Sequence, residues 1–238
     1  MVHFQTRIIS YLFLSTLLGL TIGAFVSLAA NVFVNGIKYF EALRLTLLTK
    51  FNFFVYFEYI VPFAWLTAGF FLVFLIKKIV GCTSWQGPAD AIYCAHRPDK
   101  NMDIRQGFGT VLAAFTSLSA GASLGQYGPI VHMGALIGGL FKKYNLSSIH
   151  LSNDIFLGCG VAAGVAASFN APIAGVFFAL EVVMATYGLA AFAPVVIASV
   201  TGTIVSRIYF GDYPAFIIPG HEIVSFWEFP AFALLGLV

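Results

Sequence analysis

Long uncharged stretches alternate with short polar segments along the chain. No Asp, Glu, Lys or Arg occurs at residues 8–37, 59–76 or 106–141, and Glu181 is the one charge at residues 155–206. A helix that crosses the hydrocarbon core of a bilayer needs about 20 apolar residues. The pattern therefore predicts six membrane spans or partial spans, at residues 8–34, 53–76, 106–121, 129–142, 155–185 and 187–209.

Composition supports a chain surrounded by lipid. The 238 residues include 12 basic and 10 acidic ones, and the mean hydropathy is +0.92. A soluble chain carries roughly 25% charged residues, whereas this one carries 9%. Too few polar side chains remain to cover a water-facing surface. The net charge of +2 is dispersed and predicts no nucleic-acid partner.

The two ends of the chain and its loops indicate its topology. Arg7 precedes an apolar run that is longer than the 7–15 residues of a signal-peptide core, which favours an uncleaved first helix. The linker after the second span has more Lys and Arg than the linker after the first, so the N-terminus is expected to be cytoplasmic. The apolar run from Phe226 to Val238 is too short to cross. We expect residues 1–238 to form one transmembrane domain of a longer protein.

Small residues predict how the helices pack. Glycines four residues apart let helix backbones approach closely in lipid. Such pairs occur at Gly19 and Gly23, Gly121 and Gly125, Gly134 and Gly138, and Gly160 and Gly164. The three cysteines, Cys82, Cys94 and Cys159, lack metal-ligand spacing and are expected to be unpaired membrane cysteines.

Three proline-containing segments predict helices that begin inside the membrane. Proline is favoured in the first turn of a helix, and Pro129, Pro172 and Pro88 each follow a segment rich in small or polar residues. Such a break is tolerated at that depth only where it is buried in protein or lines a wet cavity. A helix start also presents unpaired amides and about half a positive charge, so these three starts are candidate anion sites.

Two of these segments resemble a known family. Gly125-Gln-Tyr-Gly-Pro129 is similar to the Gly-x-Glu-Gly-Pro motif of the CLC chloride channels and chloride/proton antiporters, and the segment from Ala162 to Glu181 is similar to the Phe-Asn-Ala-Pro segment of that family. The resemblance implies an all-α integral membrane fold, a CLC-like bundle of tilted and discontinuous helices. It further implies the first of two inverted repeats, a homodimer, and chloride as the transported ligand without a cofactor.

The departures from the family pattern concern proton handling. The family normally has a gating glutamate at the position of Tyr127, and the antiporters have an internal proton glutamate at the position of Val182. A tyrosine hydroxyl is neutral at ordinary pH and valine carries no proton. The resemblance therefore implies a passive anion channel in the plasma (inner) membrane, with Gly125, Gln126, Tyr127, Gly128 and Pro129 at the anion.

The third segment matches less closely. The family usually has Gly-Ser-Gly-Ile-Pro, and alignment on Pro88 places Trp85 at the serine position with Ser84 one residue earlier. Either Ser84 or Trp85 could therefore face the anion.

Several other polar residues have simpler interpretations. His132 is expected to make a helix-packing hydrogen bond, Glu181 a structural hydrogen bond, and Asn170 a cap for the helix at Pro172. The aspartates at positions 90, 99 and 103 are expected to be solvated charges.

Three alternatives to a passive channel remain open. The protein could be a chloride/proton antiporter that uses other groups. It could also be a non-conducting fragment. A membrane enzyme built on Ser123 and His132 is disfavoured, because no carboxylate is placed to orient the histidine.

Overall fold

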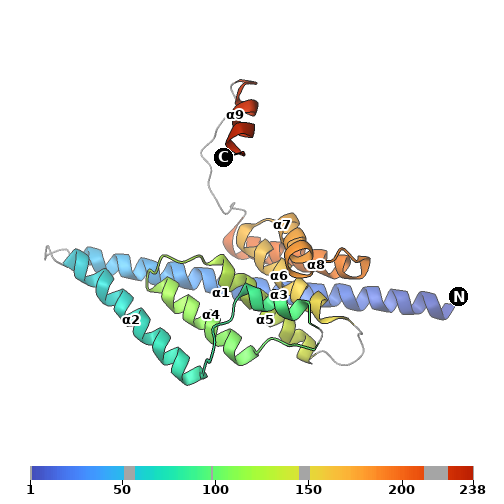
Figure 1. Cartoon of the computed structure of the whole chain (residues 1–238), viewed down its shortest axis with the longest axis horizontal. Helices are drawn as coiled ribbons and strands as arrows, with labels where there is room; N and C mark the ends of the chain where they lie inside the picture. The colour runs from blue at the N-terminus through green and yellow to red at the C-terminus, as the bar shows by residue number, and fades with distance from the viewer. Residues whose placement is uncertain (1, 51–56, 98, 145–150, 212–224, 238) are drawn as a thin grey trace.

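The computed structural model describes residues 2–50, 57–97, 99–144, 151–211 and 225–237, and these are helical with short connections, as predicted (Figure 1). The elements in chain order are α1 (Val2–Lys50), α2 (Phe57–Val80), α3 (Pro88–Ala95), α4 (Ile104–Ser119), α5 (Tyr127–Tyr144), α6 (Asn153–Phe169), α7 (Pro172–Phe177), the π-helix η1 (Phe178–Val183), α8 (Leu189–Phe210) and α9 (Glu228–Leu235).

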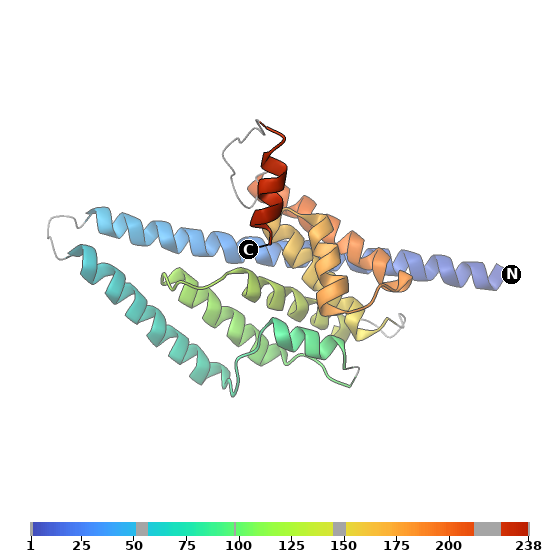
Figure 2. The same ribbon diagram turned by 45° about the horizontal axis from the view of Figure 1, so that its top comes forward.

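The core of the bundle is α6. Its side chains are buried from Ile155 to Ala167, and it packs against α5, α8, α1 and α7 (Figure 1 and Figure 2). Most of these residues are Gly, Ala or Val, so four neighbours can approach one helix. Burial on all sides explains why α6 has no polar face.

Glycines bring the helix backbones into contact. A Cβ at Gly160 of α6 would overlap the carbonyl oxygen of Gly134 on α5, and a Cβ at Gly19 of α1 would lie 2.5 Å from the carbonyl oxygen of Pro194 on α8. These glycine pairs thus pack helices as predicted. The prediction was wrong for Gly121 and Gly125, which lie in the connection after α4, where Gly121 has φ of +91°.

The first helix extends well beyond the predicted span of 8–34. At 1.5 Å per residue, the 49 residues of α1 measure about 74 Å, more than twice the hydrocarbon thickness. Lys38, Arg44 and Lys50 therefore lie in α1 and not in a linker. No proline interrupts this segment, so nothing ends the helix at the membrane surface.

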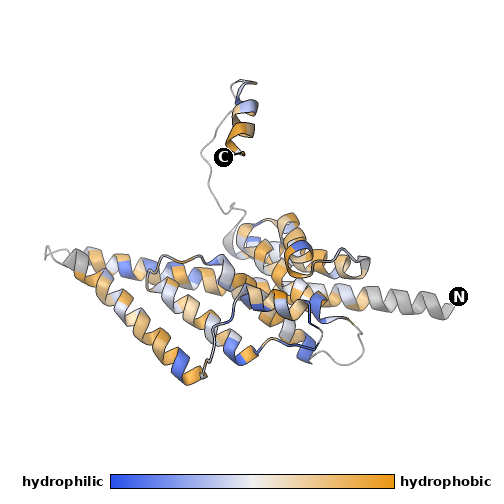
Figure 3. Cartoon of the chain, in the orientation of Figure 1, coloured by the Kyte–Doolittle hydropathy of each residue, from blue (hydrophilic) through white to orange (hydrophobic). Residues whose placement is uncertain are grey.

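Hydrophobic residues predominate along the helices, with hydrophilic segments between them (Figure 3). Within the described residues, three helices are long and apolar enough to cross a membrane, over Phe13–Thr49, Ile60–Val80 and Ala190–Tyr209. On α2, Phe63, Phe70, Phe71 and Phe74 are exposed, as suits side chains that face lipid. The expected crossing at 53–76 is α2, and residues 51–56 lie outside the described residues.

The predicted breaks are present. The expected span at 155–185 divides at Asn170, which has φ of +54°, and α7 then begins at Pro172. Helix α3 begins at Pro88 as predicted, whereas α5 begins at Tyr127, two residues before Pro129. Helix α9 has eight residues, none of them buried, and Val238 lies outside the described residues. Cys82, Cys94 and Cys159 are buried and free.

Candidate functional site

Residues 125–129 form the start of α5. The amide of Ile130 donates to the carbonyl of Gln126 over 3.4 Å, which is the beginning of the helical ladder. The amides of Tyr127 and Gly128 precede that bond and have no intrahelical acceptor. A Cβ added at Gly125 would meet nothing within 4 Å, so the space before the helix is open. Backbone donors and an open approach together suit an anion.

The ring of Tyr127 lies against the end of α6. It stacks on Phe169 with the ring centroids 4.0 Å apart and the planes 22° from parallel. Aromatic pairs of this kind contribute about 0.5–1.5 kcal/mol beyond their buried area. Residues from the two family-like motifs thus meet, and the ring of Tyr127 has a defined partner.

Residues 84–88 form the start of α3, and its donors are largely in use. The amide of Gly87 donates to Oδ2 of Asp90 over 2.7 Å, and the amide of Gln86 donates to Oγ1 of Thr110 over 3.1 Å. Pro88 has no amide hydrogen. The expectation that this start offers several free amides was therefore wrong, because a carboxylate already accepts one of them.

Two aspartates cap helices and are not simply solvated. Asp90 lies in the first turn of α3, where the positive end of the helix dipole stabilises its negative charge. The N-cap of α4 is Asp103, whose Oδ1 accepts from the amide of Gln106 over 3.1 Å. Asp99 is exposed as expected. In each case the aspartate lies three residues from the residue whose backbone amide it accepts. An aspartate at this spacing near a helix start is a signal that is visible in the sequence.

The starts of α3 and α5 are adjacent. Nδ1 of His132, on α5, lies 2.9 Å from the carbonyl oxygen of Gly87, which is the helix-packing bond expected of this histidine. The ring of Pro88 lies within 3.8 Å of where a Cβ of Gly128 would be. Ser84 and Trp85 are both exposed before α3, so the choice between them stays a prediction.

The start of α7 differs from the expectation. The N-cap of α7 is Ala171, and the helix start has no side-chain cap. Asn170 instead ends α6, and its Oδ1 accepts from Nε of Arg207 on α8 over 2.8 Å. The prediction that Asn170 caps α7 was therefore wrong. Its left-handed conformation is one that asparagine tolerates better than most residues.

Glu181 and Val182 lie on η1 and are both exposed. Within the part of the chain that the structure describes, no hydrogen bond or ion pair to Glu181 is present, so its structural role stays a prediction. A π-helical turn is rare and is found disproportionately at functional sites. Ser123 is exposed, whereas His132 is buried and bonded to Gly87. These two residues therefore do not form a nucleophile and base.

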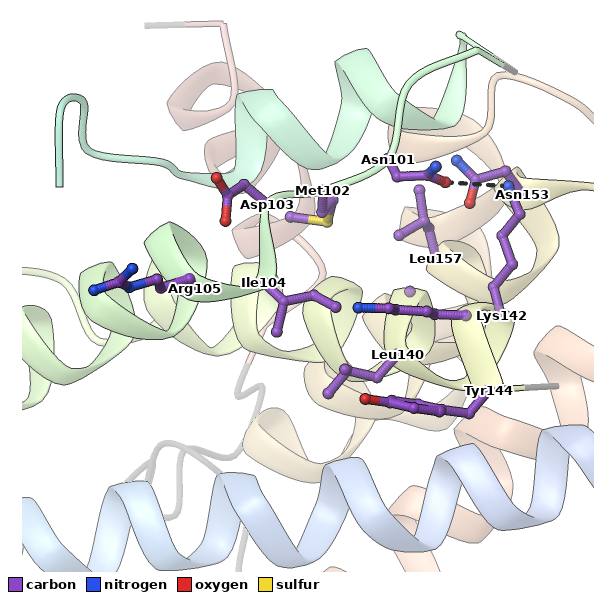
Figure 4. Close-up of a pocket in the computed structure, with 12 residues that line it drawn as sticks. Asn101, Met102, Asp103, Ile104, Arg105, Leu140, Lys142, Tyr144, Asn153 and Leu157 are labelled. Atoms are coloured by element: carbon purple, nitrogen blue, oxygen red, sulfur yellow. Dashed lines mark hydrogen bonds between the residues drawn. The ribbon is translucent and has the colours of Figure 1, made fainter. Parts of the chain in front are cut away.

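A cavity lies at the opposite end of α5, and none of the predicted anion-site residues lines it. It measures about 670 Å³ and lies between the start of α4, the end of α5 and the start of α6. Its lining includes Lys142, whose Nζ donates to Oδ1 of Asn101 over 3.3 Å. Arg105 points away from these two side chains (Figure 4).

Comparison with known proteins identifies the family. The sequence profile described as "Voltage gated chloride channel" matches residues 68–238. The chain belongs to this family. Members of the family are ion transporters and channels, which excludes the enzyme alternative.

The relatives of this chain include proteins named as channels and proteins named as exchangers. Chloride channel protein CLC-e of Arabidopsis thaliana is 35% identical over 150 residues, which are 58% of this chain and 20% of that protein. The H(+)/Cl(-) exchange transporter ClcA of Vibrio cholerae is 32% identical over 122 residues, 50% of this chain and 26% of that protein. The chain thus spans a minor part of these relatives.

Solved structures support the fold of this family member. The crystal structure of a slow cyanobacterial Cl−/H+ antiporter matches with a TM-score of 0.76 at 22% identity, and the match covers 94% of this chain and 53% of that one. A CLC-type fluoride/proton antiporter matches with a TM-score of 0.71 at 23% identity. Identity this low shows the fold alone, and it confirms the CLC-like helical bundle.

Asp90→Asn is expected to strengthen chloride binding by about threefold. Removing a negative charge at a helix start is worth about 0.3–1 kcal/mol to a nearby anion, and an asparagine oxygen can still accept the Gly87 amide. Titration calorimetry of the detergent-solubilised protein with chloride measures the affinity. Asp99→Asn, which changes an exposed turn, is the matched control. Equal affinities in the Asp90 variant and the wild type would contradict this role for the Asp90 charge.

Proposed function

We propose that this protein conducts chloride or a similar small anion passively. The observation that carries the proposal is the start of α5, where Tyr127 is stacked on Phe169 in place of a carboxylate. A neutral hydroxyl can donate a hydrogen bond to an anion, but it does not compete with the anion for the amides of Tyr127 and Gly128. In this proposal Gly125, Gln126, Gly128 and Pro129 complete the anion site.

The absence of proton coupling follows from side-chain chemistry. The family position for an internal proton carrier holds Val182, which has no titratable group. Proton exchange would therefore require other carboxylates. Asp90 is the acidic group bonded at the start of α3, but its carboxylate accepts the Gly87 amide. Glu181 is exposed on η1 and is one carboxylate that an exchange mechanism could use.

We also infer the membrane setting of the protein. Residues 1–238 form the first of two inverted repeats in a homodimer, in the plasma (inner) membrane with a cytoplasmic N-terminus. Positively charged loops tend to stay cytoplasmic. The end of the bundle where α2 and α5 finish and α4 begins has the larger group of basic residues, at Lys77, Lys78, Arg105, Lys142 and Lys143. The C-terminus of α1, at Lys50, does not lie at this end of the bundle.

Chloride flux without proton flux is the expected result in liposomes that contain the full gene product. An outward chloride gradient is imposed, and external chloride and pH are recorded together. We expect chloride efflux with no accompanying proton uptake. The Vibrio cholerae exchange transporter, in matched liposomes, shows that proton movement is detectable. Proton uptake in a fixed ratio to chloride would overturn passive conduction and favour exchange.

The non-conducting alternative has its own test. Planar-bilayer recording of residues 1–238 alone asks whether one repeat conducts. Current steps from residues 1–238 that match those of the full gene product would show that this repeat contains a complete pore. Current from the full gene product only would show that the pore needs the rest of the protein. Silence in both samples would contradict the proposed function.

A further inference from the structure

We propose that the cavity at the end of α5 binds the phosphate headgroup of an anionic phospholipid, with the ammonium groups of Lys142 and Lys143 as its charged partners. The cavity measures about 670 Å³, within the range of about 300–1,000 Å³ that is usual for small-molecule sites. Both lysines lie in the last turn of α5 and line the cavity. The site is separate from the anion site in the proposed function and does not rest on it.

The cavity lies at the level where a membrane-crossing helix ends. The apolar span of α2 covers Ile60–Val80. Nη2 of Arg105, a residue that lines the cavity, donates to the carbonyl oxygen of Ile79 over 3.4 Å. Tyr144 also lines the cavity and is exposed, and tyrosine is enriched where the chain meets the headgroups of a bilayer. These contacts place the cavity at the membrane surface, within reach of a lipid headgroup.

The two lysines lack acidic partners. Nζ of Lys142 donates to Oδ1 of Asn101 over 3.3 Å, and this neutral amide leaves the positive charge uncompensated (Figure 4). Nζ of Lys143 lies 5.8 Å from the centroid of the Tyr144 ring. Among the described residues, no ion pair to either lysine is present. Two adjacent ammonium groups that lack a carboxylate attract an anion to the cavity.

The acidic side chain at the cavity is engaged elsewhere. Asp103 is the carboxylate in the lining, and it caps α4. Its Oδ1 accepts from the backbone amide of Gln106 over 3.1 Å, and its Oδ2 accepts from Nε2 of the same residue over 3.0 Å. The positive end of α4 stabilises this charge. Asp154, in the first turn of α6, is not part of the lining. The lining therefore has more positive charge than negative and suits a phosphate.

Apolar side chains on the cavity wall favour a lipid over a free ion. Ile104, Leu140 and Leu157 line the cavity, and in Figure 4 they lie between Lys142 and Arg105. Ile104 and Leu140 are half-buried, so part of their surface remains to be covered. Inorganic phosphate has no apolar part that could cover them. A phospholipid supplies glycerol carbons and the first methylene groups of its acyl chains beside the phosphate, and burial of these groups strengthens binding.

Binding of a short-chain lipid to the full gene product in detergent tests the site. Microscale thermophoresis measures the affinities for dioctanoyl phosphatidylglycerol, for dioctanoyl phosphatidylcholine and for inorganic phosphate. We expect phosphatidylglycerol to bind about tenfold more tightly than the other two. An affinity for phosphatidylcholine equal to that for phosphatidylglycerol would overturn the anionic headgroup. An affinity for inorganic phosphate equal to that for phosphatidylglycerol would overturn the lipid and indicate a site for the free ion.

Matched double variants test the two lysines. Each basic residue near an anionic lipid surface contributes about fivefold to affinity, so we expect Lys142→Gln with Lys143→Gln to weaken phosphatidylglycerol binding about tenfold or more. Lys142→Arg with Lys143→Arg keeps both charges and should keep the affinity within about twofold, which separates loss of charge from loss of fold. Lys77→Gln with Lys78→Gln makes the same change at the end of α2, outside the lining of this cavity, and should leave the affinity unchanged. Equal losses in the two glutamine variants, or no loss in either, would overturn the proposal.

Chloride flux separates this proposal from the proposed function. If the full gene product does not conduct chloride while phosphatidylglycerol binding depends on Lys142 and Lys143, the channel proposal fails and the lipid site stands. If chloride flux is normal while phosphatidylglycerol does not bind, the lipid site alone is wrong.

Discussion

Replacing Tyr127 by glutamate is expected to make chloride flux strongly dependent on pH. The introduced carboxylate would lie at the start of α5, where the amides of Tyr127 and Gly128 lack intrahelical acceptors. An ionised carboxylate is attracted to the positive end of a helix and competes with the transported anion. Protonation removes that competition. Flux should therefore be low where the carboxyl is ionised and should rise as the pH falls.

The size of this effect follows from the energy of the competition. A competing interaction of about 1.4 kcal/mol reduces anion occupancy about tenfold, so we expect about tenfold lower flux at neutral pH than below the ordinary carboxyl pKa of about 4. Chloride efflux from liposomes is measured across this pH range. Tyr127→Phe keeps an aromatic ring to stack on Phe169, has no titratable group, and should show flat flux. A flat profile in the glutamate variant would show that position 127 does not border the anion path.

Replacing Gly160 by alanine is expected to destabilise the protein by about 3 kcal/mol, near the upper end for an overpacked core. The added Cβ would overlap the carbonyl oxygen of Gly134, and it would lie 2.7 Å from the carbonyl carbon of Gly134 and 3.3 Å from the backbone nitrogen of Gly138. Backbone atoms cannot rotate away as a side chain can, so α5 and α6 would have to separate. Unfolding in mixed detergent micelles, followed by circular dichroism, gives the change in free energy.

Gly139→Ala is the matched control for this substitution. Its Cβ would meet Cδ2 of Leu157 at 3.6 Å, which is an ordinary contact, and alanine favours a helix by about 1 kcal/mol over glycine. We therefore expect Gly139→Ala to leave stability unchanged or to raise it. Equal stabilities for the Gly160 and Gly139 variants would contradict the close backbone contact between α5 and α6.

The glycine contact also bears on the site. Tyr127 is the first residue of α5 and Phe169 is the last residue of α6, so the separation of these helices sets the distance between the stacked rings. A variant that forces the helices apart should weaken the stack. The scarcity of large side chains in α6 thus helps to hold the ring of Tyr127 in place.

Local signals in the sequence account for most of the fold. The long uncharged stretches predict lipid-facing helices, and prolines at positions 88 and 172 mark helix starts because proline fits only the first turn without losing a bond. The same logic placed the start of α5 within two residues. The pattern did not predict the length of α1, because Lys38, Arg44 and Lys50 suggest a linker although no proline there interrupts the helix.

Hydropathy and motifs are enough to identify an α-helical, lipid-embedded member of this family and to locate its helix breaks. Which breaks meet is known from the folded bundle alone. The stack of Tyr127 on Phe169 and the bond from His132 to Gly87 join residues 42 and 45 positions apart. Hydrophobic patterning reports which solvent each residue prefers and how the local backbone bends. Contacts between distant helix ends depend on how closely α5 and α6 approach, which is a property of the packed bundle.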